Sequence, residues 1–265
     1  MKLKGSLRKM KVENGSPVQY GLRTEEESVN LNECIGKEIS LRFTGSIYCK
    51  KCGKKTKTSF QGFCFNHFQN APEAAECILH PELCRAHLGE GRDVEWEKKN
   101  HDQPHVVYLA VSGGIKVGVT RETQIPTRWI DQGAKQAIVL AKTPNRYLAG
   151  VIEVDLKQYL SDKTNWQTML KDETPPFDLE KELKEYGGLV DPKYAEYIQT
   201  NSKPYTFEFP LESPPKNING LNFDKVNEVK GQLTGIKGQY LILDHEMVLN
   251  IRRHEGYEVE FESRD

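Results

Sequence analysis

The stretch VVYLAVSGGIKVGVT, residues 106–120, places two short apolar runs on either side of Ser112, Gly113 and Gly114. Short loops rich in glycine connect antiparallel strands, so the stretch predicts a buried β-hairpin. If Val111 lies opposite Ile115, the remaining pairs follow in order away from the turn. Tyr108 then faces Gly118, and Ala110 faces Lys116.

The hairpin is expected to have one apolar face and one partly polar face. Directly opposed residues point to the same side of a sheet, so Tyr108, Lys116, Gly118 and Thr120 share one side. The valines, leucine and isoleucine of the two runs fill the other side as core. A tyrosine next to a residue without a side chain, with a lysine two positions along, suggests that space is left for a ligand.

Helical and strand patterns follow the hairpin. Pro126 can open a helix that carries Arg128 and ends at Gly133, and residues 136–143 read as a third strand. A longer helix follows with Asn145 as its N-cap. Glu153 and Lys157 fall outside its predicted buried stripe, which consists of Leu148, Val151, Ile152, Leu156, Tyr159 and Leu160.

The order and spacing of these residues resemble the GIY-YIG endonuclease domain over residues 106–170. VVY stands where that family has GIY, and KVG, which contains Lys116 and Gly118, stands where it has YIG. An arginine on the next helix and a glutamate on the following one complete the likeness. The chain as a whole also resembles a zinc-binding bacterial protein family of unknown function.

The resemblance implies catalytic roles for several residues. Tyr108 would help to deprotonate the attacking water, and Arg128 would stabilise charge on the phosphate. Glu153 would hold Mg²⁺ or Mn²⁺, and Asn165 would complete the site. Such an arrangement suits phosphodiester hydrolysis, which needs an activated water and positive charge around the phosphate.

Two departures from the family pattern affect this interpretation. The first motif lacks glycine, and Lys116 replaces the second motif tyrosine. A lysine serves as a base only if its pKa is lowered, and otherwise it is a phosphate binder. Each residue also has a structural explanation: Glu153 can pair with Lys157 at i, i+4, and Asn165 can delimit a helix.

The segment CKKCGKKTKTSFQGFCFNH predicts a zinc site. Cys49 and Cys52 form one pair with a two-residue gap, and Cys64 and His67 form another. Each tight pair reaches one ion, and the longer gap lets a hairpin bring the two pairs together around tetrahedral Zn²⁺. With four protein ligands the site would be structural.

A second zinc site is expected from Cys77, Cys84, His87 and His101, with His80 as the alternative ligand. Cys84 and His87 repeat the two-residue gap, while Cys77 and His101 join from either side. The competing interpretation is a short helix that carries polar histidines on its surface. Cys34 lies outside both patterns and is expected to be a buried, small apolar residue.

Lysines and phenylalanines alternate around the first cysteine pair, which raises the question of nucleic-acid contact. The lysines can neutralise phosphates, and exposed aromatic rings can stack on bases. The alternative is that the phenylalanines form a small local core. The residues concerned are Lys50, Lys51, Lys54, Lys55, Lys57, Phe60, Phe63, Phe65 and Phe68.

Charge is distributed unevenly along the 265 residues, although the net charge is only -1. Residues 1–68 hold 13 Lys/Arg against 6 Asp/Glu, and residues 106–170 hold 8 against 5. Residues 69–105 and 171–265 are acidic. The two basic segments predict DNA or RNA as a partner. We expect a soluble, cytoplasmic protein without membrane contact, because no apolar run has the length of a membrane span.

The expected fold class is α+β with several domains. Residues 1–48 and 221–265 are β-rich and barrel-like or sandwich-like, and the two ends can pair into one sheet. Residues 49–105 form a zinc-ribbon-like segment, 106–170 the small α/β domain, and 171–220 a helical and Pro-rich linker. The leading functional hypothesis is a metal-dependent endonuclease, and the alternative is an inactive zinc-containing factor that binds nucleic acid or protein.

Overall fold

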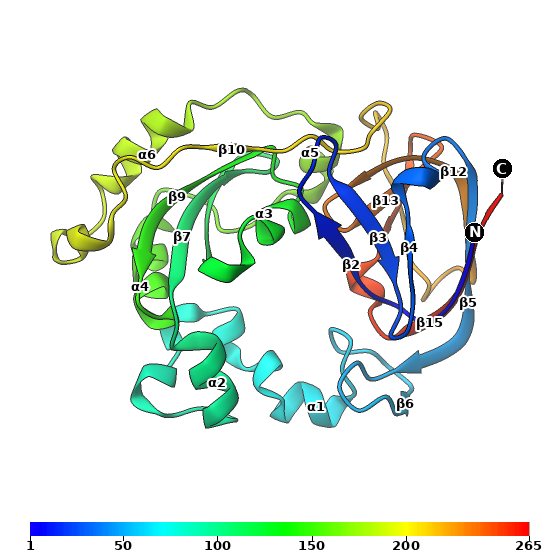
Figure 1. Ribbon diagram of the computed structural model, residues 1–265, viewed down its shortest axis with the longest axis horizontal. Helices are drawn as coiled ribbons and strands as arrows, with labels where there is room; N and C mark the ends of the chain where they lie inside the picture. Colours follow the sequence, from blue (N-terminus) through cyan, green and yellow to red (C-terminus); the bar gives the residue numbers. More distant parts are fainter. Residues whose placement is uncertain (265) are drawn as a thin grey trace. The chain divides into compact units, whose positions relative to one another are not determined.

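The computed structural model describes residues 1–264, which divide into two compact units. One unit comprises residues 1–68 and 207–264, and the other comprises residues 69–206. Several sheets and a few short helices make this a mixed α+β protein (Figure 1).

The first unit is built mainly from strands. An eight-stranded sheet runs in the order β1-β15-β5-β12-β13-β14-β11, with β6 paired to β5, and β2, β3 and β4 form a separate sheet. The strands are β1 Lys2–Ser6, β2 Arg8–Glu13, β3 Gln19–Arg23, β4 Ser28–Asn30, β5 Glu38–Tyr48, β6 Lys55–Thr56, β11 Asn219–Leu221, β12 Glu228–Lys237, β13 Tyr240–Leu243, β14 Met247–Asn250 and β15 Tyr257–Arg264, and helix α1 is Phe65–Asn70.

The two ends of the chain pair into one sheet, as the sequence allows. Strand β1 pairs with β15, which pairs with β5, and all these pairings are antiparallel. Burial alternates along β15, with Val259 and Phe261 inside, because one face of the sheet is covered. Within residues 1–264 the sheet stays open from β1 to β11, so of the expected barrel-like or sandwich-like forms a closed barrel is not found. The reason is that β11 adds to β14 in parallel and the path does not return to β1.

The second unit centres on a four-stranded antiparallel sheet in the order β10-β9-β7-β8. Around it lie helices and 3₁₀ turns (Figure 1). The strands are β7 His105–Val111, β8 Ile115–Arg121, β9 Gln136–Thr143 and β10 Tyr205–Thr206, and the helices are α2 Val94–His101, α3 Thr127–Asp131, α4 Arg146–Leu156, α5 Trp166–Lys171 and α6 Leu179–Gly187.

The hairpin of β7 and β8 has the predicted register. Val111 faces Ile115, Ala110 faces Lys116, and Tyr108 faces Gly118. Ser112, Gly113 and Gly114 form the turn, and Gly113 has a φ of 70°, which favours glycine. The third strand, β9, occupies the predicted residues and pairs with β7.

Helices α3 and α4 cover opposite faces of this sheet (Figure 1). Val107 and Leu109 of β7 belong to the same apolar cluster as Ile152 and Leu156 of α4. On the other face, the ring of Tyr108 meets the ring of Trp129 from α3 at 5.7 Å between centroids.

The helix after β9 begins at the predicted N-cap, but its buried face differs in part from the predicted stripe. The Asn145 side chain accepts a hydrogen bond from the Leu148 amide at 3.0 Å. Tyr159, predicted to be buried, is 54% exposed because the helix ends at Leu156 and the periodicity stops there. Glu153, expected outside the stripe, is only 6% exposed.

Gly150 gives a test of how closely α4 packs against the segment that precedes the hairpin. A Cβ atom at this position would lie 2.2 Å from the backbone nitrogen of Glu82. Alanine normally stabilises a helix interior by about 1 kcal/mol relative to glycine. We expect Gly150→Ala to lower the free energy of unfolding by about 2 kcal/mol, because overpacking displaces backbone.

Gly187→Ala is the matched control, since Gly187 ends α6 and its added Cβ would meet only the Ile198 Cγ2 atom at 3.3 Å. Chemical denaturation should show this variant at or slightly above wild-type stability. A stabilised Gly150→Ala chain would contradict the close contact.

Candidate functional site

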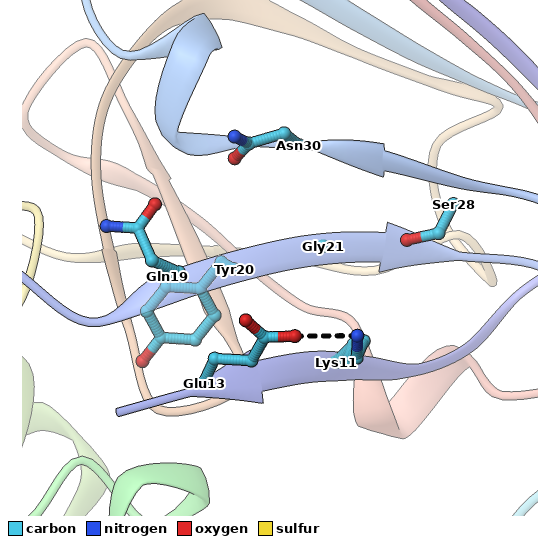
Figure 2. A pocket seen from close by; sticks show the side chains of 7 residues that line it. All are labelled: Lys11, Glu13, Gln19, Tyr20, Gly21, Ser28 and Asn30. Atoms are coloured by element: carbon cyan, nitrogen blue, oxygen red, sulfur yellow. Dashed lines mark ion pairs between the residues drawn. The ribbon is translucent and has the colours of Figure 1, made fainter. Parts of the chain in front are cut away.

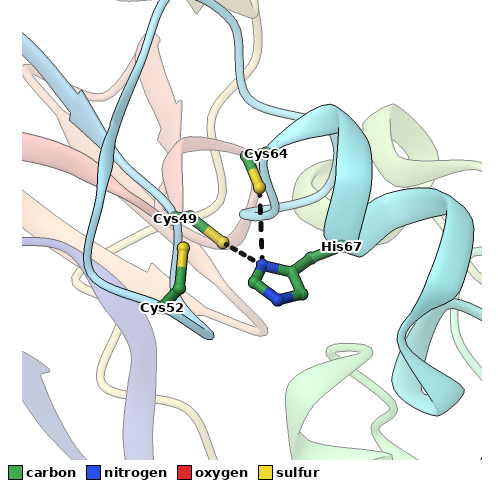
Figure 3. Close-up of side chains that lie close together, drawn as sticks. All are labelled: Cys49, Cys52, Cys64 and His67. Atoms are coloured by element: carbon green, nitrogen blue, oxygen red, sulfur yellow. Dashed lines mark hydrogen bonds between the residues drawn. The ribbon is translucent and has the colours of Figure 1, made fainter.

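The first Cys/His cluster brings together Cys49, Cys52, Cys64 and His67, as predicted. Cys49 and Cys52 flank the tight turn after β5, Cys64 precedes α1, and His67 lies on α1. Figure 3 shows the three sulfur atoms and the imidazole converging on one point. The His67 Nδ1 atom lies 3.4 Å from the Sγ atoms of both Cys49 and Cys64.

This geometry fits a tetrahedral zinc ion. With zinc–sulfur and zinc–nitrogen distances of about 2.3 and 2.0 Å, a thiolate and an imidazole nitrogen lie roughly 3.5 Å apart. Burial raises the pKa of Cys49, but hydrogen bonds from backbone N–H groups and from His67 outweigh it and bring the pKa down to about 6. A thiolate is the form that binds zinc.

The second cluster brings together Cys77, Cys84 and His101, all of them buried. The cysteines lie on either side of the 3₁₀ turn Pro81–Leu83, and His101 is the last residue of α2. The Cys77 Sγ atom lies 3.9 Å from the His101 Nδ1 atom. A hydrogen bond from Cys77 lowers the pKa of the Cys84 thiol, so the pair stabilises a thiolate at this position. The three donors could therefore hold zinc.

The structure does not bring His87 into this group. Its ring stacks on Tyr147 at 4.8 Å between centroids, and its Nδ1 atom is buried without a hydrogen-bond partner among the described residues. His80 is also outside the group and lies 3.3 Å from Glu82, Nδ1 to Oε1. A carboxylate oxygen of Glu97 approaches the His101 Nδ1 atom to 3.8 Å, a contact that sequence spacing did not suggest.

A polar pocket of about 390 Å³ lies in the second unit. It unites residues from the two strands of the hairpin, helices α3 and α4, the loop after α4 and the segment between Cys77 and Cys84. Its lining consists of Ile78, Leu79, His80, Pro81, Tyr108, Val117, Gly118, Val119, Arg128, Gln132, Arg146, Glu153, Lys157, Asp162 and Lys163.

One face of α4 contributes Arg146 and Glu153 to this lining, and Lys157 follows directly after the helix. These three residues and Gly150 recur at intervals of three or four, which places them on one side of the helix. The Arg146 guanidinium donates hydrogen bonds to the carbonyl oxygens of Cys77 and Ile78, both at 3.0 Å. Sequence analysis missed Arg146, although its spacing from Glu153 was the signal that could have found it.

Tyr108 is buried in the pocket wall. Its hydroxyl group donates a hydrogen bond to the Gln132 Oε1 atom at 3.0 Å. Burial raises the pKa of this phenol, although the neighbouring Arg128 opposes the shift. A Cβ atom at Gly118 would lie 2.6 Å from the Tyr108 hydroxyl oxygen. The space next to Gly118, expected to receive a ligand, is therefore filled by the tyrosine itself.

Glu153 forms an ion pair within the pocket. Its Oε2 atom lies 3.2 Å from Lys157 Nζ, and the same Nζ lies 3.3 Å from Asp162 Oδ2. Burial raises the pKa of Glu153, while Lys157 opposes the shift. Glu153 belongs to neither group of clustered metal-ligating side chains found among residues 1–264.

Two of the predicted catalytic residues do not line the pocket. Lys116 is buried, and its Nζ donates a hydrogen bond to Thr164 Oγ1 at 2.7 Å. Burial lowers the pKa of Lys116 to about 7. The exposed Asn165 caps α5, because its Oδ1 atom accepts hydrogen bonds from the amides of Gln167 and Thr168.

Around the first cluster, aromatic rings pack largely on one another. Phe60 contacts both Phe65 and Phe68, with ring centroids 5.7 and 5.6 Å apart. Lys50 pairs with Glu255 at 3.1 Å and lies 4.3 Å from the centroid of the buried Phe63 ring. The local core that was weighed as an alternative thus accounts for these contacts, while Phe65 remains 57% exposed.

A second hollow lies on the small sheet of β2, β3 and β4 (Figure 2). Lys11 and Glu13 contact each other there at 2.6 Å, so their charges offset one another. The lining consists of Lys11, Glu13, Gln19, Tyr20, Gly21, Ser28 and Asn30.

These features define an α+β protein with two Cys/His clusters and a polar pocket. Residues 36–259 match a family described as a protein of unknown function, DUF2797, and the chain belongs to that family. Searches of curated proteins and of solved structures give no match. None of the helices described in residues 1–264 combines the length and apolar character of a membrane span.

Metal analysis tests both clusters. We expect about two zinc ions per chain, and about one after either Cys52→Ser or Cys84→Ser, because each change removes one donor from a single site. Cys34→Ala is the control and should keep both ions, since Cys34 belongs to neither cluster. Full zinc content in either serine variant would contradict the assignment of that cluster.

The buried amine of Lys116 predicts a pH-dependent stability. Between about pH 7 and 10.5 the unfolded chain holds a proton that the folded chain has released, so this group makes stability rise with pH. We expect Lys116→Met to raise the free energy of unfolding by on the order of 3 kcal/mol at pH 6, with a smaller gain at pH 9.5.

Denaturant unfolding at both pH values measures this difference, with the exposed Lys181→Met as the control. An equal effect of Lys116→Met at pH 6 and pH 9.5 would show that the amine titrates normally.

Proposed function

We propose that this chain is a metal-dependent phosphodiesterase that acts on DNA or RNA, with an active site like that of the GIY-YIG endonucleases. The main support is the pocket in which Tyr108, Arg128 and Glu153 meet from a strand and two helices. These are three of the residues that the resemblance assigns to catalysis. The order of the elements also agrees with the resemblance, since the hairpin is followed by a helix, a strand and a second helix around an antiparallel sheet.

The charges of the pocket suit a phosphodiester. Arg128, Arg146, Lys157 and Lys163 contribute four cationic side chains, against the carboxylates of Glu153 and Asp162. Positive groups aimed at a phosphate stabilise the charge that develops during hydrolysis. In this proposal Arg128 is the main phosphate ligand, since Arg146 is already bonded to two carbonyl groups.

Glu153 is the residue that would hold the divalent cation. Mg²⁺ is often bound by one or two carboxylates together with substrate phosphates, so a single glutamate is sufficient on the protein side. The Lys157 Nζ atom also lies 3.3 Å from Asp162 Oδ2. Lys157 therefore keeps an ion-pair partner when Glu153 binds the metal ion. The bound ion would offset charge on the transferring phosphate.

Tyr108 and Lys116 are the two groups that could handle the proton of the attacking water. Tyr108 faces the pocket, but its raised pKa favours the neutral phenol. Lys116 has a pKa of about 7, as a base at neutral pH requires, but its amine bonds to Thr164 beside the pocket. We assign the water-orienting role to Tyr108, because Lys116 does not line the pocket.

The basic segment around the first cluster, in the first unit, is a separate candidate for nucleic-acid binding. Lys54, Lys55 and Lys57 are exposed there, and a zinc ion at Cys49, Cys52, Cys64 and His67 would fix the loop that carries them. Contacts of this kind give binding that weakens as salt concentration increases.

A second function has specific support, namely a factor that binds nucleic acid without cutting it. The Glu153–Lys157 ion pair neutralises the carboxylate that a metal would need, and Lys116 stands where the endonucleases have a tyrosine. Both features leave phosphate binding intact while they weaken catalysis.

The two functions are separated by a cleavage assay with Mg²⁺ or Mn²⁺ on duplex, branched and single-stranded substrates. We expect cleavage that falls by about 10²-fold or more in Glu153→Gln and in Arg128→Ala, because each change removes charge stabilisation from the phosphate. Glu185→Gln, an exposed position on α6, is the matched control and should retain full activity.

Salt-sensitive binding without cleavage by the wild-type chain would instead support the non-catalytic factor. If the chain neither binds nor cleaves these polymers, both functions are wrong.

A further inference from the structure

The segment between the two cysteines of the second cluster forms a wall of the pocket. Ile78, Leu79, His80 and Pro81 all line the cavity, together with Arg128 and Glu153. His80 thus faces the pocket rather than the metal donors, although sequence spacing made it an alternative zinc ligand. This placement gives the pocket a histidine that the GIY-YIG likeness, confined to residues 106–170, does not include.

The backbone around His80 is held firmly in place. On one side, the Arg146 guanidinium binds the carbonyl oxygens of Cys77 and Ile78. On the other side, the Glu82 nitrogen lies so close to Gly150 that no side chain fits between them. Both anchors come from α4, the helix that also carries Glu153. The positions of His80 and Glu153 are therefore fixed by the same element.

A carboxylate stands next to the His80 ring. The Nδ1 atom of His80 lies 3.3 Å from Glu82 Oε1, and the two side chains are 54% and 26% exposed. A carboxylate beside Nδ1 orients the imidazole ring and leaves Nε2 as the ring nitrogen available to a ligand. The Nε2 atom can then exchange a proton with a bound ligand, as in active sites where a carboxylate contacts the other nitrogen of a catalytic histidine.

We propose that His80 is the proton donor to the leaving oxygen during phosphodiester hydrolysis, and that Glu82 is its positioning residue. This inference rests on the proposed function. Water adds to phosphorus, and the bond from phosphorus to the ester oxygen breaks. The departing oxygen takes the proton from His80 Nε2, which gives an alcohol and a phosphate monoester. His80, now neutral, takes a proton back from the solvent. The proton released by the attacking water goes to the solvent.

Substrates with different leaving groups test this role. One is an oligonucleotide, whose sugar alkoxide needs a proton, and the other is a nitrophenyl ester of a nucleotide, whose leaving group departs without one. General acid catalysis contributes about 10²- to 10⁴-fold. We expect His80→Asn to lose about 10²-fold or more on the oligonucleotide but less than about threefold on the nitrophenyl ester.

Glu82→Gln should show a weaker loss, about tenfold, with the same preference for the nitrophenyl ester. His245→Asn is the matched control, since His245 is an exposed histidine in the other unit with its Nε2 atom 3.7 Å from Glu212. Its rates on both substrates should equal those of the wild type. Zinc content should remain unchanged in all three variants.

The remaining outcomes overturn the inference in distinguishable ways. Equal losses of His80→Asn on both substrates would mark a structural role, and loss of one zinc ion would make His80 a ligand. No loss on the oligonucleotide would exclude His80 from the reaction. In each of these cases the wild-type chain still cleaves and the proposed function stands. A wild-type chain that cleaves neither substrate removes the proposed function and this inference together.

Discussion

Helix α4 contacts the backbone of the Cys77–Cys84 segment in two places, at Arg146 and at Gly150. The pocket depends on both contacts. The half-buried Arg146 side chain donates hydrogen bonds to two carbonyl oxygens, which satisfies donors that would otherwise be costly to bury. Gly150 lets the segment approach the helix more closely than any side chain would allow. A neighbouring face of α4 buries Ile152 and Leu156 against the sheet. The helix therefore fixes the pocket wall relative to the hairpin.

The second Cys/His cluster lies in a segment that a bound metal ion would stabilise. Residues 69–93 contain short 3₁₀ turns and little apolar core, since only Ala75, Cys77, Cys84 and Ala86 form a buried cluster there. A segment of this kind gains stability from metal ligation, because the free energy of binding contributes to folding. Zinc held by Cys77, Cys84 and His101 would make the pocket wall rigid. A metal ion at this cluster would thus be linked to the pocket geometry through a single loop.

Much of the second unit could be predicted from the sequence, because its signals are local. The glycines of the turn set the hairpin register, and Asn145 marks the start of α4. In the first unit, the cysteine spacing likewise indicated the first cluster. Contacts between distant segments could not be predicted in this way. Arg146 binds carbonyl groups nearly 70 positions away, and backbone acceptors carry no sequence signature.

The errors have the same origin. Gly118 suggested an open space because the sequence gives no information on the orientation of the Tyr108 ring, which occupies that space. Glu153 was placed outside the buried stripe because only the apolar face of the helix was considered. The terminal strands pair as the alternation allows, but closure into a barrel depends on long-range connections that alternation does not encode.

The most direct test of the central claim is a crystal structure of the zinc-loaded chain soaked with Mn²⁺ and a short oligonucleotide, with anomalous scattering used to locate the manganese. If the pocket is a phosphodiesterase site, the manganese peak lies on the Glu153 carboxylate, a phosphate contacts Arg128, and Lys157 pairs with Asp162. A structure in which Lys157 stays on Glu153, and the manganese and phosphate bind elsewhere, would contradict this account.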